Sequence, residues 1–424
     1  MKKGAVKRAM KRKTGDWGKA PWKMAFRAKG GRLPERVDVA IVGGGFTGLA
    51  AAAMVKRLAP TKSVLLMEAE RVGNGASGRT GGMVLAETAA GNLPGLGDVL
   101  KGYREILREL GVKADVELPG VWELARGPRS MEGKAVHAIE RSPIEWNDLG
   151  KLRVVKKVPG GAVNPGKVVA GLARAAQDGG AQIAEHTAVE KLEFSHPVRL
   201  HVQRRKPGSR GVERNVVAAE QVLIATNAGS VELGEELFAG REPAEPKLTF
   251  ALATARLGEK HLKEIGLGSR RPFYTVDLPY LWGRLLDDGR LIFGSGLVPG
   301  WGESMREESR KKKGVKFSKD RLWSGLEKVD VRKGEAAERL ASLEKRVRAL
   351  HPALEKIRVT HRWGGPILIT REFMPVFRRH PRSAQVIVSG GYSGHGVALS
   401  VYLGARAARV MAGKFAEEWE LKAR

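Results

Sequence analysis

The chain has 424 residues, of which 42% are hydrophobic, enough for two or more compact units with sizeable cores. It contains no cysteine, which excludes disulfides, thiolate metal sites and any cofactor linked through a cysteine sulfur. The 75 basic and 46 acidic residues give a net charge of +29, and no stretch approaches the roughly 20 apolar residues that a membrane-spanning helix needs.

A basic arm is expected at residues 1–36, where 13 Lys or Arg residues stand against two acids, a net charge of 13 − 2 = +11. No apolar core follows, so the arm is not a secretory signal. We interpret it as a solvated tail. The alternatives are contact with an anionic partner such as nucleic acid or membrane phosphate, and an organelle address for an otherwise cytoplasmic protein. Trp17, Trp22 and Phe26 could hold the arm against the body or stack on nucleic-acid bases.

A strand, a glycine-rich turn and a helix open the first folded unit. The apolar run Val37–Val42 precedes Gly43, Gly45 and Gly48, in G-x-G-x-x-G spacing, and the Ala-rich segment Leu49–Leu58 follows. In such a turn the first glycine permits the sharp bend, the second lets the backbone approach a pyrophosphate, and the third allows close packing of helix on strand. The start of the helix offers free N–H groups and the positive end of its dipole to that pyrophosphate. The pattern predicts a dinucleotide site.

The next stretch narrows the choice of dinucleotide. A second apolar run, Val64–Met67, ends at Glu68, twenty residues after the last glycine of the turn, where an acid accepts hydrogen bonds from an adenosine ribose. The loop of residues 73–82 is long and built mostly of small residues, with Ser77 and the single cation Arg79 as polar anchors. We interpret it as backbone lying against a flat ring; an ordinary loop is the alternative.

The segments GGGFTGL and GASGRTGG, together with the acid at Glu68, resemble those of FAD-dependent amine and amino-acid oxidoreductases of the D-amino-acid oxidase and glycine oxidase family. Within the family the gamma-glutamylputrescine oxidoreductase branch is most similar, and the resemblance extends from about Asp38 to Gly413. It implies non-covalent FAD, since Met83 stands where a histidine could tether the flavin. The FAD contacts implied in this first part are Gly43, Gly45, Phe46, Thr47, Gly48, Glu68, Ala69, Ser77, Gly78, Arg79, Thr80, Gly81, Gly82 and Met83.

The middle of the chain alternates helices and strands. We expect helices at Leu100–Leu110, Met131–Leu149 and Pro165–Gln177, with Trp146 in a core, and a strand at Val116–Leu124. Further on, the residues expected to complete the adenosine end are the backbone of Val189, which the resemblance places at the adenine, and Ala225 and Thr226, where the strand beginning at Val222 ends. A hairpin, Arg199–Val216, lies between them.

An antiparallel substrate domain is expected from Pro246 onward, because short apolar runs then alternate with turns such as Asp287-Asp288-Gly289. Tyr280, Trp282 and Arg284 alternate along one run and can share a face, which the resemblance directs toward the active cavity. The strands expected here are Lys247–Leu257, Phe273–Thr275, Tyr280–Arg284, Arg290–Leu297 and Arg358–Ile369, with a helix at Glu335–Ala349 and an exposed insertion at Trp301–Val329.

The last motif is a strand ending at Ser389, a glycine turn, and a helix from Gly396 to Met411. By resemblance the start of this helix points at the flavin pyrimidine ring, where its dipole would stabilise the negative charge of the reduced form. The FAD contacts implied here are Gly394, His395, Gly396 and Val397.

We therefore predict an α/β fold with a Rossmann-like FAD-binding domain in three segments, residues 37–120, 157–245 and 357–424, and an antiparallel-sheet substrate domain at 121–156 and 246–356. The resemblance implies oxidation of the C–N bond of a small amine or amino acid. Hydride passes to flavin N5, the resulting imine hydrolyses, and electrons go on to O2 or another acceptor. No metal is expected, since no cluster of His, Asp and Glu has ligand spacing.

Two glycines limit the choice of substrate. Gly365 and Gly394 align with the two arginines that hold the substrate carboxylate in glycine oxidases, so an α-amino acid loses its usual clamp. Arg284 or Arg371 could replace it, or the substrate could lack that carboxylate. The candidate substrate contacts are Tyr280, Trp282, Arg284, Arg371 and Tyr392. The alternative function is a flavoprotein acting on or bound to RNA, such as a tRNA amine-modifying enzyme, through its basic surface.

Overall fold

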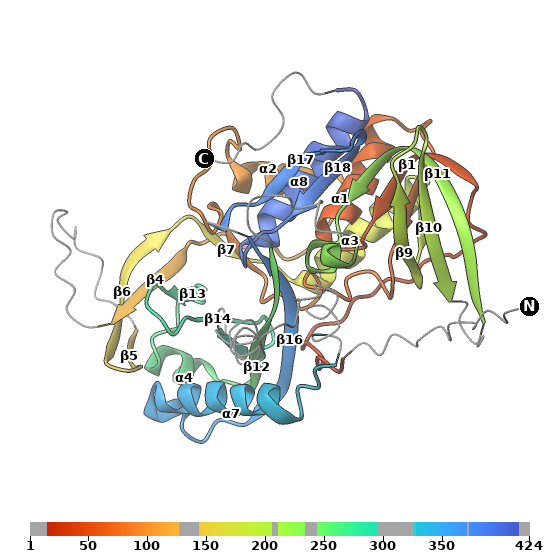
Figure 1. The fold of residues 1–424 in the computed structure, drawn as a ribbon. Coiled ribbons are helices and arrows are strands. Elements are labelled where there is room, and N and C mark those ends of the chain that lie inside the picture. The colour runs from red at the N-terminus through yellow and green to blue at the C-terminus, as the bar shows by residue number, and fades with distance from the viewer. Residues whose placement is uncertain are drawn as a thin grey trace, which may run out of the picture.

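The computed structural model describes residues 15–126, 144–205, 211–233, 244–295, 326, 328–370 and 373–414. Two large sheets of eight strands each organise these residues, and a pair of short strands, β3 (Met83–Leu85) and β7 (Gly160–Ala162), lies beside them. In Figure 1 the two sheets occupy opposite halves of the molecule, with β16 and β12 running between them. The α/β class predicted from the sequence is confirmed.

The first sheet is built on buried parallel strands. β1 pairs with β2 and β11, and β11 pairs with β18, all in parallel. Every residue of β2 is buried, as expected of a strand that is covered on both faces. In sheet order its strands are β17 Val376–His380, β18 Ser383–Gly390, β11 Val212–Ile224, β1 Arg36–Val42, β2 Val64–Met67 and β8 Gln182–Ala184. Two further strands branch from this order: β10 (Val198–Arg205) pairs with β11, and β9 (Thr187–Glu193) pairs with β10.

Helices cover one face of this sheet, and the β9–β10 hairpin covers apolar residues of the other. The helices are α1 Phe46–Leu58, α2 Val99–Glu109, α3 Pro165–Asp178 and α8 Gly396–Met411. Small residues let α1 pack closely: a Cβ on Gly48 would lie 2.0 Å from the Gly43 carbonyl oxygen, and one on Gly404 of α8 would lie 2.3 Å from the Thr47 carbonyl oxygen. The third glycine of the turn is therefore required by packing, as its spacing predicts.

The second sheet is largely antiparallel, and α4 (Glu259–Glu264) and α7 (Gly334–Ala349) pack on one of its faces. Their shared core centres on Trp146, whose ring meets Phe273 edge-on at 4.8 Å. In sheet order the strands are β16 Val359–Ile369, β12 Glu245–Arg256, β15 Arg290–Ser295, β14 Leu281–Leu285, β13 Phe273–Thr275, β4 Val121–Arg126, β6 Lys151–Val158 and β5 Glu145–Asn147.

Three expectations from the sequence differ from the structure. Of the expected helix Met131–Leu149, residues 131–143 lie outside the described residues, and Glu145–Asn147 is strand β5, with Trp146 buried as expected. Of the expected exposed insertion Trp301–Val329, most lies outside the described residues, but Leu326 and Val329 are buried. β16 belongs to the second sheet, through ten paired residues of β12, although we assigned residues 357–369 to the FAD-binding domain.

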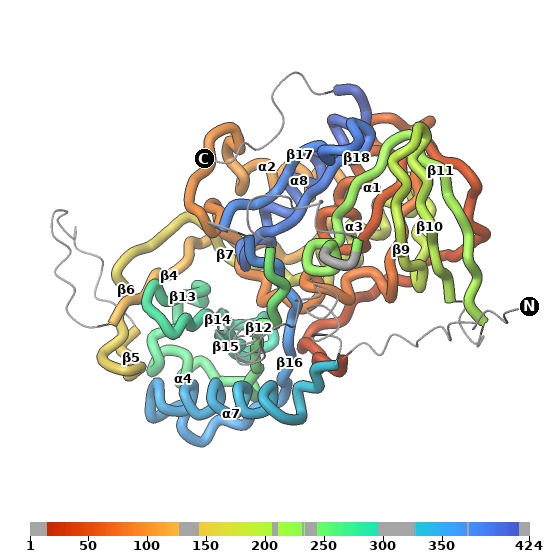
Figure 2. The backbone as a smooth tube through the Cα atoms, viewed as in Figure 1, coloured from red at the N-terminus to blue at the C-terminus, as the bar shows by residue number. Residues whose placement is uncertain are grey.

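The part of the N-terminal arm that the structure describes, residues 15–36, lies against the body, so this part is not a solvated tail. Trp17 is 5% exposed and donates from Nε1 to the Leu326 carbonyl oxygen at 2.9 Å. The Trp22 indole donates to the Gly78 carbonyl oxygen at 2.8 Å. Figure 2 shows this red segment starting beside α7 and β16 and running on toward β9 and β10. Within the described segments every helix is too short or too polar to cross a bilayer.

Candidate active site

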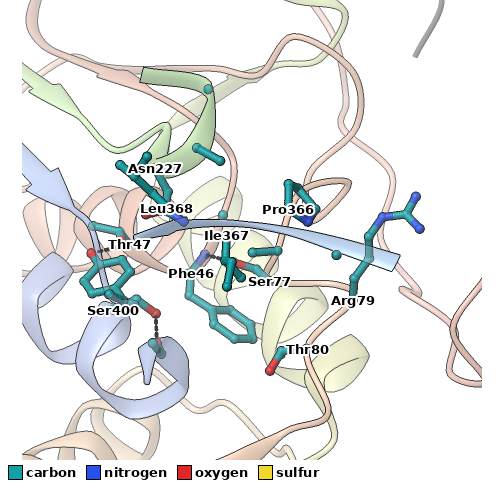
Figure 3. A pocket seen from close by; sticks show the side chains of 18 of the residues that line it. Phe46, Thr47, Ser77, Arg79, Thr80, Asn227, Pro366, Ile367, Leu368 and Ser400 are labelled. Atoms are coloured by element: carbon teal, nitrogen blue, oxygen red, sulfur yellow. Dashed lines mark hydrogen bonds between the residues drawn. The ribbon is translucent and has the colours of Figure 1, made fainter. Parts of the chain in front are cut away.

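A cavity of about 670 Å³ lies between the two sheets, within the range typical of small-molecule sites. At one end it is lined by the glycine turn and by residues 68–70 and 187–189, and at the other by Tyr280, Trp282, His395 and the strand β16. Figure 3 shows Phe46, Ser77 and Thr80 below the strand that carries Pro366–Leu368, while Arg79 points away from them. The cavity therefore connects the predicted dinucleotide turn to the aromatic side of the second sheet.

The glycine turn has the geometry that a pyrophosphate cradle requires. Gly43 has a φ of +111°, and a Cβ there would lie 2.7 Å from the Ala225 carbonyl oxygen, so only glycine is tolerated. Helix α1 begins at Phe46, and its first residues, Phe46 and Thr47, line the cavity together with Thr226. Ser77 of the loop accepts a hydrogen bond from the Phe46 amide at 2.9 Å. The turn can present unpaired amides and the helix dipole to an anion.

Glu68 stands at the end of β2 on the cavity wall. Its carboxylate accepts hydrogen bonds from the amides of Gly44 at 2.8 Å and Glu70 at 3.0 Å. Burial nevertheless raises the pKa of this carboxyl above its ordinary value, because those two bonds do not offset its desolvation. Ribose hydroxyls would supply further donors, and Val189 lines the cavity beside it.

Three regions of the chain hold the loop of residues 73–82 in place. Arg79 donates to the Gly18 carbonyl oxygen at 2.7 Å and lies over the Trp17 ring at 5.5 Å. The Trp363 indole of β16 donates to the Arg79 carbonyl oxygen at 2.8 Å. From β14, Arg284 donates to the carbonyl oxygens of Gly81 and Val163. The loop backbone is thus fixed by side chains that come from the N-terminal segment and from the second sheet.

Two candidate substrate contacts have structural partners instead. Arg284 is 5% exposed, its guanidinium is engaged by backbone carbonyls, and burial lowers its pKa to about 10. Tyr392 lines the cavity, but its hydroxyl lies between Thr47 Oγ1 at 2.6 Å and Ser389 Oγ at 3.1 Å, and burial raises its pKa to about 12. Arg284 is not among the residues that line the cavity, since the carbonyl oxygens of Gly81 and Val163 accept from its Nε and Nη2; its contact with substrate stays a prediction. Arg371 lies outside the described residues.

The far end of the cavity is formed by the turn before α8. His395 is partly buried, its Nδ1 has no hydrogen-bond partner among the described residues, and burial lowers the pKa of the imidazole. Gly394 has a φ of +92°, a conformation that favours glycine. His395 lines the cavity at this end, where its imidazole can contact a ligand.

The residues present fit FAD: a glycine-only cradle, a partly buried carboxylate, a backbone-lined middle and a polar far end share one elongated cavity. Of the predicted contacts, Gly48, Gly78 and Gly82 lie behind the lining and serve packing; the individual contacts to FAD remain predictions. The predicted residues that line the cavity are Gly43, Gly45, Phe46, Thr47, Glu68, Ala69, Ser77, Arg79, Thr80, Gly81, Met83, Val189, Ala225, Thr226, Gly394, His395, Gly396 and Val397.

Several lining residues were missed from the sequence. Trp17 and Trp363 border the loop, and Asn227, at a φ of +47°, accepts a hydrogen bond from the Gly391 amide at 2.9 Å through Oδ1. The only sign of the two tryptophans in the sequence is that they are large aromatic residues among polar or glycine neighbours. Asn227 has no such sign, because its role depends on a contact 164 residues away.

Comparison with known proteins agrees with this geometry. The chain is 26% identical over 414 residues to gamma-glutamylputrescine oxidoreductase of Escherichia coli, covering 89% of this chain and 84% of that one. It is 28% identical over 417 residues to the probable oxidoreductase OrdL of Rhizobium meliloti, covering 90% and 84%.

Among solved structures, glycine oxidase of Geobacillus kaustophilus has the same fold, with a TM-score of 0.63 at 19% identity over 92% of this chain and 100% of that one. Iminodiacetate oxidase of Chelativorans sp. BNC1 gives 0.60 at 17% identity over 90% and 96%. Residues 38–410 match the family described as FAD dependent oxidoreductase. The chain belongs to this family of FAD-dependent oxidoreductases.

Proposed function

We propose that this enzyme oxidises the C–N bond of a small amine or amino acid. The observation that carries the proposal is the single cavity that joins the dinucleotide cradle to a chamber walled by Trp282, Tyr280 and Met83. When bound, FAD would accept two electrons and the hydrogen from the substrate carbon, leaving an imine that water converts to a carbonyl compound and ammonia or an amine. The two curated relatives named above, both oxidoreductases, support the same class of reaction.

The chain's own part in this reaction is to bind and orient. Trp282 and Met83 give the chamber an apolar wall, which disfavours the charged ammonium and so favours the uncharged amine that can be oxidised. The start of α8 at Gly396 directs its positive dipole end into the cavity, where negative charge would be stabilised. We assign no side chain as a general base, since a neutral amine requires none.

The fixed part of the chamber favours an amine without a carboxylate next to its nitrogen. A Cβ at Gly365 would lie 3.3 Å from Cβ of Arg79, so an arginine there would meet the loop. Gly394 offers no side chain either. The relative from Escherichia coli is named for gamma-glutamylputrescine, which agrees with this preference.

A panel of amines and amino acids, assayed with O2 and with an artificial electron acceptor, tests the proposal. We expect at least one amine to bleach the flavin absorbance without air and to release a carbonyl product with turnover. The flavin should separate from acid-precipitated protein, since its binding is proposed to be non-covalent. A holoenzyme that no amine or amino acid reduces would disprove the proposed function.

The RNA-linked alternative rests on the basic N-terminal arm and the net charge of +29. It predicts an affinity for RNA that falls steeply with salt, and oxidation of an amine within RNA. If RNA binds in a salt-dependent way but is not oxidised, the positive charge attracts RNA without making it a substrate.

A further inference from the structure

The register of the second sheet places one row of side chains on the face turned away from α4 and α7. Trp122 and Leu124 of β4 pack in the core beneath those helices, so Glu123 between them points to the opposite face. Glu123 pairs across the sheet with Tyr274 of β13, which pairs in turn with Trp282 of β14. Trp282 lines the cavity, and the row therefore runs from the cavity wall to a carboxylate.

The contacts along this row leave polar groups available to a ligand. The Tyr274 hydroxyl donates to Oε2 of Glu123 at 3.0 Å. The Tyr274 ring lies 6.2 Å from the ring of Tyr280, which lines the cavity. The Tyr280 hydroxyl has no hydrogen-bond partner among the described residues, although burial, and then the charge of Glu123, raise its pKa. Tyr280 lines the cavity, and Tyr274 and Glu123 follow it just outside the lining residues, so a hydroxyl without a partner and a carboxylate are available to a polar ligand group that extends from the cavity.

The charge of Glu123 is not neutralised within the described part of the chain. It makes no ion pair there, and Lys156, its register partner on β6, is exposed and not within 4 Å of its carboxylate. Next to this corner the cavity is lined by Val276 and Leu278, which are 44% and 80% exposed, so the cavity opens to solvent here. In a protein of net charge +29, an acid without an ion pair, next to two tyrosine rings near this opening, is suited to a cation.

We propose that the substrate carries a second cationic group, an ammonium or guanidinium, beyond the nitrogen that is oxidised, and that Glu123 binds it beside Tyr274 and Tyr280. The proposal rests on the proposed function and names the substrate class of that same site. The apolar chamber at Trp282 takes the uncharged end of the substrate, and the acidic corner takes the charged end. α,ω-Diamines and longer polyamines have this chemistry.

Holoenzyme kinetics on matched pairs, an n-alkylamine and the α,ω-diamine of the same chain length, test the proposal. We expect kcat/KM to favour the diamine by about 10-fold or more, mainly through KM, as for a charge-assisted contact. Glu123→Gln should abolish this preference by lowering kcat/KM for the diamine, and Glu123→Asp should restore part of it. The control is Glu145→Gln, an exposed acid on β5 of the same sheet that already pairs with Lys151 and Arg153.

Equal kcat/KM for both members of each pair, or a preference that survives in Glu123→Gln, would overturn the proposal while the amine oxidase function stands. If no amine is oxidised, the proposed function fails, and calorimetric titration of the holoenzyme with a diamine still decides the site. Binding that is lost in Glu123→Gln supports it, and binding that is absent or unchanged in the variant refutes it. Should Glu123→Gln lose its flavin, Tyr274→Phe provides the second variant, with a smaller loss of preference expected.

Discussion

The two halves of the cavity are built by different means. At the dinucleotide end, backbone makes the site: a glycine at positive φ, a helix start and one carboxylate at a strand end. At the substrate end, side chains from separate strands make it, and their meeting depends on sheet register. Backbone geometry constrains residue type tightly, so the first half allows few substitutions. The second half can change its residues without changing the fold, which is where specificity can vary.

The loop of residues 73–82 joins the halves, and the N-terminal segment holds it. Trp17, Gly18 and Trp22 contact the loop or its neighbours, yet residues 15–33 precede the part of the chain that matches the family. A segment that looks like an appendage in the sequence therefore contributes to the shared wall between the two halves.

Deleting residues 1–30 should have the largest effect. From sequence alone a solvated arm predicts little change, but removing Trp17 and Trp22 exposes their contact surface and releases the loop. We expect a loss of roughly 2–5 kcal/mol in the free energy of unfolding, from about 1.5–3 kcal/mol for the buried Trp17 and about half of that for the partly buried Trp22, and a large drop in FAD content. Denaturant titration and flavin absorbance measure both. The matched control is deletion of residues 1–14; equal stability of the two truncated proteins would show that the contacts of residues 15–30 contribute nothing.

Arg284→Met should have the next largest effect. We expect the free energy of unfolding to fall by about 2–3 kcal/mol, because the carbonyl oxygens of Gly81 and Val163 lose buried charge-assisted donors. Arg284→Lys should recover only part of this stability, since one ammonium cannot donate in the two fixed directions of a guanidinium. FAD affinity should fall while the diamine preference of the remaining holoenzyme persists. A variant with normal FAD affinity but altered substrate preference would return Arg284 to the substrate site.

Local patterns allowed the dinucleotide half to be predicted almost completely. β1, the glycine turn, β2 and α8 were all located from apolar runs and glycine spacing, because each depends on residues near one another in sequence. Sheet membership was harder: β16 reads as a strand, but its pairing with β12 is decided by contacts more than one hundred residues apart. β5 was mistaken for part of a helix because a three-residue strand leaves no periodicity to detect.

For the substrate half, the sequence predicted some of the residues that line the cavity but not what each of them contacts. Tyr280 and Trp282 were identified from their alternation, and the structure places both on the cavity wall. The same alternation included Arg284, whose partners on the loop have no local signal. Glu123 was missed altogether, since an acid in a short strand looks like an ordinary surface residue until the register shows which face it occupies.

Glu68→Gln should weaken FAD binding by about 1–3 kcal/mol, by removing a charged acceptor for ribose hydroxyls. Its effect on the apo-protein should have the opposite sign. Because burial raises the pKa of Glu68 in the folded state, the native apo-protein binds more protons than the unfolded chain just above the ordinary carboxyl pKa, so this group makes stability fall as pH rises there. The variant should lack that fall and be somewhat more stable at neutral pH. Flavin titration and unfolding between pH 4 and 8 measure the two effects, and an apo-variant less stable at neutral pH would contradict the raised pKa.

Deleting residues 1–14 should have the smallest effect on the enzyme and isolates the role of charge. The segment holds seven Lys or Arg residues and no acid, so its removal lowers the net charge from +29 to +22. Its electrostatic attraction to an anionic partner acts over a Debye length of about 10 Å at 0.1 M salt, and added salt screens it. We expect affinity for heparin or RNA to fall mostly at low salt, with FAD content, stability and amine turnover unchanged. Retention on heparin across a salt gradient measures this. Equal retention of the shortened protein would place the anion-binding charge on the folded body, and the basic start would then have no electrostatic role of its own.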